Sequence, residues 1–404
     1  MNLQSPIFLA SSPLLTALFL CVVAFVVSLA VYPLILRLAF RRNVMDTPNA
    51  RKLQSRPIPV MGGVVVFVGW LAAMCLSFAA FRFYLNPWRI FAIALMVVVG
   101  VCDDVKGLSA LFRLLVEIGV ICIMVFLVGT AFDCLHGLWG LPNYLPKGFY
   151  IPFTIFAGVG IINAINLIDG VDGYCSGYCA LASIAFAVFF MQSRDYVFAA
   201  WALACAGALV PFILHNIFGR ESKMYLGDGG TLMMGTVLAM FVFRVLCRNA
   251  SNHFYAESGM GLIPFTLAIF AIPVFDTLRV MLSRIMQHRS PFSPDKTHLH
   301  HLFIDMGFSH VGTTVCLLSA NFAVVLVWWL SYRLGLSIDG QFYLVVVLSL
   351  LETWGFYGWM RRHQRRNSPL YQSMLKIGEA SHMEREGVWK FMRRLMDGRP
   401  TKIK

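Results

Sequence analysis

The chain has 404 residues, of which 58% are hydrophobic and only 13% are charged, and its formal net charge is +13. Because soluble globular proteins have about 25% charged residues, this composition excludes an ordinary soluble protein and predicts a polytopic membrane protein. The ten cysteines show no CxxC pair and no metal-ligand spacing, so we expect free thiols. The basic charge comes without a nucleic-acid-binding motif, and we expect no nucleic-acid partner.

About eleven mostly apolar segments follow one another along the chain, and roughly 20 such residues are needed to cross the bilayer core. They lie near residues 8–36, 61–80, 89–102, 108–130, 150–168, 174–191, 196–218, 229–247, 259–283, 312–332 and 340–360. The pattern predicts an all-α fold, a polytopic membrane helix bundle of about eleven transmembrane helices.

Basic residues gather in the loop after the first segment and at the end of the chain. The loop contains Arg37, Arg41, Arg42, Arg51, Lys52 and Arg56, and the residues after 360 include twelve Lys or Arg and four acids. The positive-inside rule places both in the cytoplasm, and an odd number of spans then places the N-terminus outside. We expect a membrane domain over residues 1–360 and a basic cytoplasmic tail over residues 361–404.

One stretch of this tail, EGVWKFMRRLM (386–396), is weakly amphipathic. Such a pattern is typical of an interfacial helix that touches anionic lipid headgroups. A tail that is only solvated is the alternative.

Four polar motifs stand at the ends of apolar segments. CDDVKG (102–107) ends the third, NAINLIDGVDG (163–173) ends the fifth, YLGDGGT (225–231) precedes the eighth, and SPFSPDKTHLHH (290–301) follows the ninth. On the predicted topology all four face the cytoplasm, whereas unrelated loop charges would lie on both faces. The arrangement predicts an active-site groove on the cytoplasmic face.

These motifs combine the groups that phosphoryl chemistry needs. Their carboxylates suit a hard cation, and magnesium is typically held by one or two carboxylates plus substrate phosphates. Lys and Arg of the same loops suit phosphate groups, and glycines let backbone amides approach a diphosphate. Asn163, Asn166 and Asp169 recur every three residues, so they share one face at a helix end; simple capping of that helix is the alternative.

The HLHH stretch (298–301) follows residues rich in proline and charge, which predicts a loop. Histidine can donate hydrogen bonds to phosphate and titrates near neutral pH, so we expect His298, His300 and His301 to contact phosphate. Zinc binding and structural packing are the alternatives, and the closely spaced Cys or His partners of a four-ligand zinc site are absent from the sequence.

In this order, and together with DTPNARK and PVMGG (46–63), the motifs resemble those of the polyprenyl-phosphate N-acetylhexosamine-1-phosphate transferases (glycosyltransferase 4 family) over about residues 30–310. HLHH and its lead are similar to the WecA-like branch, which is related to TagO and MraY. The resemblance implies transfer of N-acetylglucosamine 1-phosphate from UDP-N-acetylglucosamine to undecaprenyl phosphate, with release of UMP. This reaction would initiate a cell-surface glycan such as O-antigen, common antigen or teichoic acid.

The resemblance also implies a magnesium-dependent enzyme, with manganese as an alternative ion, in the bacterial cytoplasmic (inner) membrane. The expected partners are UDP-N-acetylglucosamine, undecaprenyl phosphate and the lipid bilayer, and such bundles can pair as homodimers. Another UDP-N-acetylhexosamine is an alternative donor. Direct attack by the lipid phosphate and covalent catalysis through an aspartate both stay open.

Residue roles follow from the same resemblance. Asp228 would bind the metal with Asn166 assisting, and Asp103 or Asp104 would bind or deprotonate the lipid phosphate, with the choice between them open. The expected substrate-binding residues are Arg51, Lys52, Asn163, Asp169, Gly170, Asp172, Lys223, Tyr225, His298, His300 and His301. Asp172 is expected near the uracil, with Tyr225 stacked on that base.

Two other classes share part of the pattern. An ion-coupled transporter would place its acids near the bilayer midplane at broken helices, whereas these motifs lie at one surface. A CDP-alcohol phosphotransferase or a membrane phosphatase would share the phosphate chemistry, but the sequence has neither the compact acidic array of the first nor the Ser-Gly-His motif of the second.

Overall fold

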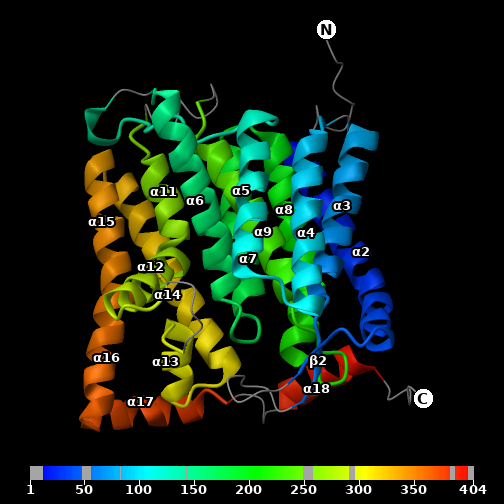
Figure 1. Cartoon of the computed structure of the whole chain (residues 1–404), viewed down its shortest axis with the longest axis vertical. Coiled ribbons are helices and arrows are strands. Elements are labelled where there is room, and N and C mark those ends of the chain that lie inside the picture. The colour runs from blue at the N-terminus through cyan, green and yellow to red at the C-terminus, as the bar shows by residue number, and fades with distance from the viewer. Residues whose placement is uncertain are drawn as a thin grey trace. The chain divides into compact units, whose positions relative to one another are not determined.

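A computed structural model of the chain describes residues 12–47, 56–81, 83–141, 144–248, 258–290, 296–382 and 387–398. These residues are mostly helical (Figure 1). The described strands are β1 (Met45–Asp46) and β2 (Ile58–Pro59), which pair antiparallel. The all-α class predicted from the sequence is confirmed.

Each predicted apolar segment coincides with one helix or with two or three consecutive helical elements. Among the described residues, eight helices are long and apolar enough to cross a membrane, and nine spans result if one bent pair is counted. Helix α4 (Pro87–Lys106) is not among them because it carries four charged residues, and α5 (Ala110–Phe126) has only 17 residues. The count of eleven spans and their orientation therefore stay predictions.

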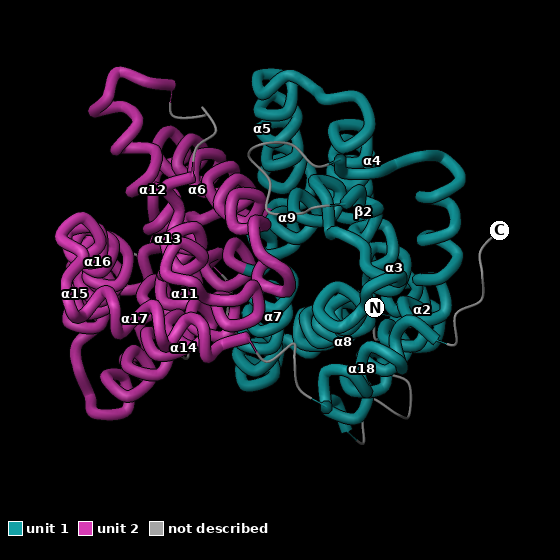
Figure 2. The backbone as a smooth tube through the Cα atoms, turned by 90° about the horizontal axis from the view of Figure 1, so that it is seen from below, with its two compact units in different colours: residues 1–129, 176–241, 385–404 teal, residues 130–175, 242–384 magenta. Residues whose placement is uncertain are grey.

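The chain forms two compact units, coloured separately in Figure 2. The first consists of residues 1–129, 176–241 and 385–404. Besides β1, β2, α4 and α5 it contains α2 (Pro13–Arg41), α3 (Gly62–Phe81), α7 (Tyr174–Gln192) from Ser176 onward, α8 (Tyr196–Phe218), α9 (Gly227–Leu246) up to Phe241, and α18 (Gly387–Asp397). Helix α2 packs along α8 and α3, and α4 packs on α5.

Glycines let two of these helices approach the N-terminus of α9. A β-carbon at Gly63 of α3 would lie 2.2 Å from the backbone nitrogen of Gly230, and one at Gly100 of α4 would lie 2.4 Å from the carbonyl carbon of Asp228. Only a residue without a β-carbon allows backbones to meet this closely. The first turn of α9, which carries Asp228, is thereby enclosed by α3 and α4.

The second unit consists of residues 130–175 and 242–384. Its described helices are η1 (Leu138–Gly140), α6 (Lys147–Leu167), α11 (Leu262–Ile269), α12 (Ala271–Met286), α13 (Leu299–Asp305), α14 (His310–Arg333), α15 (Ile338–Leu350), η2 (Leu351–Gly355), α16 (Phe356–Arg365) and α17 (Pro369–Ala380). Helix α11 packs on α14 and α15, and α12 packs on α6.

The ninth apolar segment, expected as one continuous span, is broken. Helices α11 and α12 meet at Phe270 with a bend of 72°. Pro273 explains the break, because proline has no N–H and its ring clashes with the carbonyl four residues earlier in a continuous helix. The sequence prediction of a single helix was wrong here.

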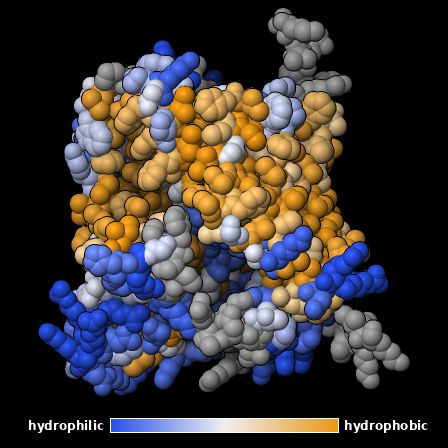
Figure 3. All heavy atoms as spheres, viewed as in Figure 1, coloured by the Kyte–Doolittle hydropathy of each residue, from blue (hydrophilic) through white to orange (hydrophobic). Residues whose placement is uncertain are grey.

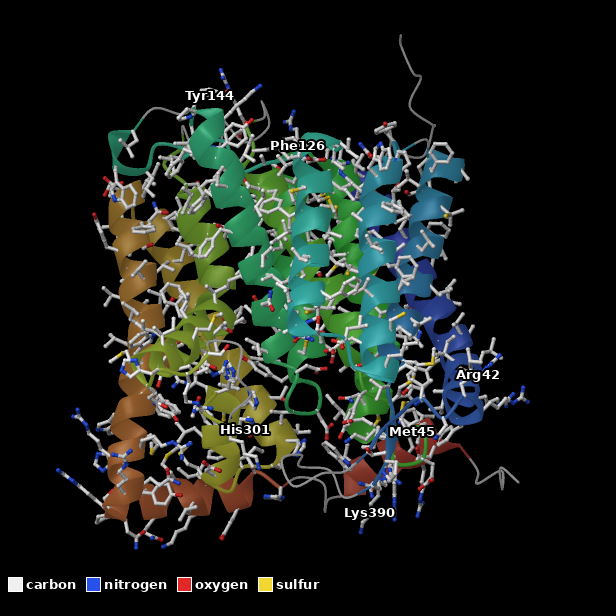
Figure 4. All side chains as sticks on the ribbon, in the orientation of Figure 1. Arg42, Met45, Phe126, Tyr144, His301 and Lys390 are labelled. Atoms are coloured by element: carbon white, nitrogen blue, oxygen red, sulfur yellow. The ribbon has the colours of Figure 1, made fainter. Side chains whose placement is uncertain are left out.

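Each unit has the surface of a membrane protein when viewed by itself. Figure 3 shows hydrophobic residues over the middle of each unit and hydrophilic residues gathered at its lower end. In the first unit, Arg42, Met45 and Lys390 lie at one end and Phe126 lies at the other (Figure 4). The division predicted at residue 360 stays a prediction.

Candidate active site

The first unit contains a cluster of three carboxylates and one guanidinium, formed by Asp103, Asp104, Asp228 and Arg113 and called here the carboxylate cluster. Helix α4 ends at Lys106, and Gly107, with φ of +66°, turns the chain toward α5. Arg113 of α5 then lies 2.7 Å from the Asp103 carboxylate and 3.6 Å from that of Asp228. One guanidinium thus lies against two of the predicted catalytic carboxylates.

The two adjacent aspartates have different surroundings, which the sequence did not reveal. Asp103 pairs with Arg113 and also accepts the Leu108 N–H at 2.6 Å. Asp104 accepts the N–H groups of Asp228 and Gly229 at 3.1 and 3.3 Å, so it caps the N-terminus of α9 from another helix. Asp104 lies beyond the apolar stretch 89–102, where burial and the nearby charge of Asp228 raise its pKa to about 8.

The carboxylate of Asp228 is more accessible than that of Asp103, with 31% of its side chain exposed against 8%. The segment that leads to it is held by β2, since the Tyr225 N–H donates to Pro59 and its carbonyl accepts the Gly62 N–H. The Lys223 ammonium lies 5.8 Å from the centre of the Tyr225 ring. The predicted residues 223, 225 and 228 therefore belong to one fixed stretch of the first unit.

The second unit contains the histidines, which lie on a helix and not in the expected loop. His298 precedes α13, and the next three residues form its first turn. The Asp276 carboxylate of α12 accepts the Leu299 N–H at 3.2 Å and contacts His298 Nδ1 at 2.9 Å. A carboxylate supplied by a distant helix thus caps α13, which explains why the local sequence predicted a loop.

Asp276 is itself fixed by Arg279. The guanidinium donates to the other Asp276 oxygen at 2.6 Å and to the Thr297 carbonyl at 2.6 Å, and it lies 3.7 Å over the Tyr357 ring. With Nδ1 engaged, His298 Nε2 is buried and has no hydrogen-bond partner among the described residues. This nitrogen is therefore the one that His298 can offer to a ligand.

His300 packs against two predicted site residues of its own unit. Its ring is parallel to that of His298, with centroids 5.7 Å apart, and a β-carbon at Gly170 would lie 2.3 Å from its Nε2. Burial, together with the neighbouring His301 and His298, holds the pKa of His300 well below its usual range. His300 is therefore a neutral imidazole at neutral pH. Figure 4 labels His301 on the same helix.

The NAINLIDGVDG motif closes α6 and turns toward α7. The Asn163 side chain donates to the Val159 carbonyl of its own helix at 3.0 Å, and Asn166 lies in the last turn. Asp169 is exposed beyond the helix end. The Asp172 carboxylate lies 3.0 Å from Nδ1 of His310, the first residue of α14.

The structure distributes the predicted residues over the two units. Asp103, Asp104, Lys223, Tyr225 and Asp228 belong to the first. Asn163, Asn166, Asp169, Gly170, Asp172, His298, His300 and His301 belong to the second. Arg51 and Lys52 lie outside the described residues. The pairing of Asp228 with Asn166 at one metal ion stays a prediction.

Sequence analysis missed Asp276, Arg279 and His310. The sequence does contain a signal for Asp276 and Arg279. They are an acid and a base three residues apart inside an apolar segment, and burying such charges is costly, so they usually have a function. Within the described ranges, no three His, Cys, Asp or Glu residues converge in a way that could hold a metal ion. All ten cysteines are free thiols, as expected.

Comparison with known proteins identifies the family. The family model described as glycosyl transferase family 4 matches residues 87–246. The undecaprenyl-phosphate alpha-N-acetylglucosaminyl 1-phosphate transferase of Escherichia coli (strain K12) is 30% identical over 281 residues, or 68% of this chain and 72% of that protein. The chain belongs to glycosyl transferase family 4. The resemblance inferred from the motifs is confirmed.

Further relatives of this family 4 protein match more of its length. A transferase of the same name from Yersinia pestis is 28% identical over 342 residues, covering 82% of this chain and 90% of its own. A probable undecaprenyl-phosphate N-acetylglucosaminyl 1-phosphate transferase of Bacillus subtilis (strain 168) is 27% identical over 341 residues, with the same coverage. The apolar helices and these relatives together make the chain a multi-pass membrane protein.

Proposed function

We propose that this family 4 transferase moves N-acetylglucosamine 1-phosphate from UDP-N-acetylglucosamine to undecaprenyl phosphate. The products are undecaprenyl-diphosphate-N-acetylglucosamine and UMP, and the site faces the cytoplasm at the bacterial inner membrane. The names of the relatives support the acceptor and the transferred group. The observation that carries the proposal is the carboxylate cluster, in which Arg113 contacts both Asp103 and Asp228 at the ends of three helices.

Phosphoryl transfer depends on positioning and on neutralising phosphate charge. In the carboxylate cluster, Arg113 offsets the charge of Asp103, while Asp104 holds the first turn of α9 and so fixes the position of Asp228. The Asp228 carboxylate is partly exposed, so it can serve as an oxygen ligand. We assign proton exchange with the acceptor phosphate to Asp104 and not to Asp103, because Arg113 and the Leu108 N–H engage the Asp103 carboxylate, whereas burial and Asp228 raise the pKa of Asp104 to about 8, within reach of neutral pH.

A magnesium ion fits this donor set, since such ions are typically held by one or two carboxylates together with substrate phosphates. Asp228 would hold it, with Asn166 as the second predicted ligand and manganese as an alternative ion. The ion would supply positive charge next to the diphosphate. The partly exposed Asp228 carboxylate is the feature of the carboxylate cluster that supports a divalent cation.

Of the histidines in the second unit, His298 would act on the phosphate oxygens. Because the Asp276 carboxylate engages Nδ1 of His298, Nε2 is the ring atom that faces a substrate; it accepts a hydrogen bond or a proton there when the ring is neutral, and it donates to a phosphate oxygen only as the imidazolium. His300 is neutral and packs under the turn at Gly170, so its role is to hold that turn in place.

The test is transfer of labelled sugar phosphate by purified protein, with UMP release followed in magnesium and in chelator. Wild-type protein should give magnesium-dependent lipid product, and Asp228→Asn should lower the rate by at least 10²-fold, as loss of a charge-stabilising group does. Glu221→Gln is the matched control, because it changes another acid of the first unit that is exposed.

Each outcome of this assay has a definite meaning. If product forms only with a different UDP-N-acetylhexosamine, the proposed reaction stands and the proposed donor is replaced. Absence of product with every donor from folded protein would refute the transferase. An Asp228→Asn rate equal to that of Glu221→Gln would remove Asp228 from the reaction.

A further inference from the structure

Helix α18 near the end of the chain is a built part of the first unit. Its Trp389 side chain is buried, with the ring centroid 4.6 Å from that of Phe218 at the end of α8. Its last residue, Asp397, accepts the consecutive N–H groups of Arg220, Glu221 and Ser222 at 3.0 to 3.1 Å. Three successive amides converging on one carboxylate form an anion-binding nest.

The nest ties α18 to the core of its unit. The Ser222 hydroxyl donates to the same Asp397 oxygen at 2.8 Å, while the Ser222 carbonyl accepts the Tyr32 hydroxyl at 2.7 Å. The tail helix is therefore held at both ends, by Trp389 and by Asp397. A tail that is merely solvated would make neither contact.

Away from these contacts, α18 carries exposed residues of two kinds. Val388, Phe391 and Leu395 are 74%, 65% and 60% exposed, and their spacing of three and four residues puts them on one side of the helix. Lys390 and Arg394 are exposed next to this apolar stripe. In Figure 1 the helix lies crosswise to the long helices of its unit, at the end where Figure 4 shows Lys390 and Arg42.

The geometry points to α18 as a docking helix for the surface of an anionic phospholipid bilayer. The apolar stripe would enter the boundary between headgroups and acyl chains, and Lys390 and Arg394 would meet the lipid phosphates. Amphipathic helices with basic flanks bind membranes in this way. The positive charges of Lys390 and Arg394 favour an anionic membrane surface over a zwitterionic one. Binding to this surface is a separate interaction from the transfer reaction.

Docking would also restrain a segment of the candidate site. The nest residues 220–222 immediately precede Lys223 and Tyr225, which lead to Asp228. Since Asp397 belongs to α18 and binds the nest, fixing α18 on the bilayer reduces the motion of residues 220–222.

The test is hydrogen exchange of the full chain in nanodiscs that hold one copy each, either of phosphatidylcholine alone or with phosphatidylglycerol added. Amides of residues 387–397 should exchange about 25-fold more slowly in the anionic discs, because Lys390 and Arg394 each add roughly a fivefold preference for an anionic surface. Lys390→Glu with Arg394→Glu should abolish the difference, and Phe391→Ser should reduce it.

A matched control carries the same change in net charge at exposed residues elsewhere, Lys147→Glu with Arg194→Glu, and should keep the lipid dependence. Equal exchange of residues 387–397 in both lipids for the wild-type chain would overturn the proposal without any variant. The same measurement in discs that hold two copies tests self-association: protection that appears only there, whatever the lipid charge, would assign the apolar stripe to a second copy and overturn the proposal as well. None of these readings depends on the transfer assay.

Discussion

His298 is held by a single carboxylate, and that contact decides which of its ring nitrogens can reach a substrate. Asp276 engages Nδ1 at 2.9 Å and is itself bonded to Arg279. We infer that Asp276 is a positioning residue. Asp276→Asn should lower kcat by about 10²- to 10⁴-fold, with a smaller change in KM, because the ring loses its preferred tautomer. Steady-state kinetics of the transfer reaction check this.

A purely structural role would give a different pattern, which a double variant separates. If Asp276 acts through His298, Asp276→Asn combined with His298→Gln should be no slower than His298→Gln alone. Asp305→Asn is the matched control, since it breaks another Asp–Arg pair of the same unit, with Arg361, on the surface. Additive losses in the double variant would contradict the positioning role.

Between elements, α4 closely approaches the start of α9 in the first unit. A β-carbon at Gly100 would lie 2.4 Å from backbone atoms of Asp228 and Gly229, which cannot rotate away. Gly100→Ala should therefore move the first turn of α9, and a displacement near 1 Å at a reacting group can cost about 10²-fold in rate. The melting temperature should fall too, since overpacking costs roughly 1–3 kcal/mol.

The matched control for this substitution is Gly119→Ala in α5, where a β-carbon meets nothing within 4 Å. It should leave both the transfer rate and the melting temperature close to those of the wild-type chain. If Gly100→Ala behaved like Gly119→Ala in both measurements, α9 would not be held by this contact.

At the scale of the whole molecule, the sequence predicted the features that depend on composition and on the order of neighbouring residues. The apolar segments gave the helices, and CDDVKG gave the end of α4 because Gly107 can take a positive φ. The contacts that couple distant segments were not predictable in this way. Asp276 and His298 are 22 residues apart, and Asp397 is 175 residues from Ser222. Only the packing of helices brings such groups together, and no local pattern encodes it.

The stability of the chain should depend on pH through His300. In the folded chain its pKa is lowered by burial and by His301, His298 and His310, against the opposing charge of Asp276. In the unfolded chain it is near 6.5. Below that value the unfolded state binds more protons, so stability is lost as pH falls, by up to about 1.4 kcal/mol per pH unit.

Melting temperatures between pH 7.5 and 5.5 should therefore fall less steeply for His300→Asn than for the wild-type chain, whatever the absolute stability of the variant. His288→Asn removes an exposed histidine of the same unit and serves as the control, which should keep the wild-type slope. Only the slope bears on this point, because the substitution itself also changes packing under Gly170. Identical slopes for all three proteins would mean that the buried imidazole is protonated at no cost to folding, and the neutral state assigned to His300 would then be wrong.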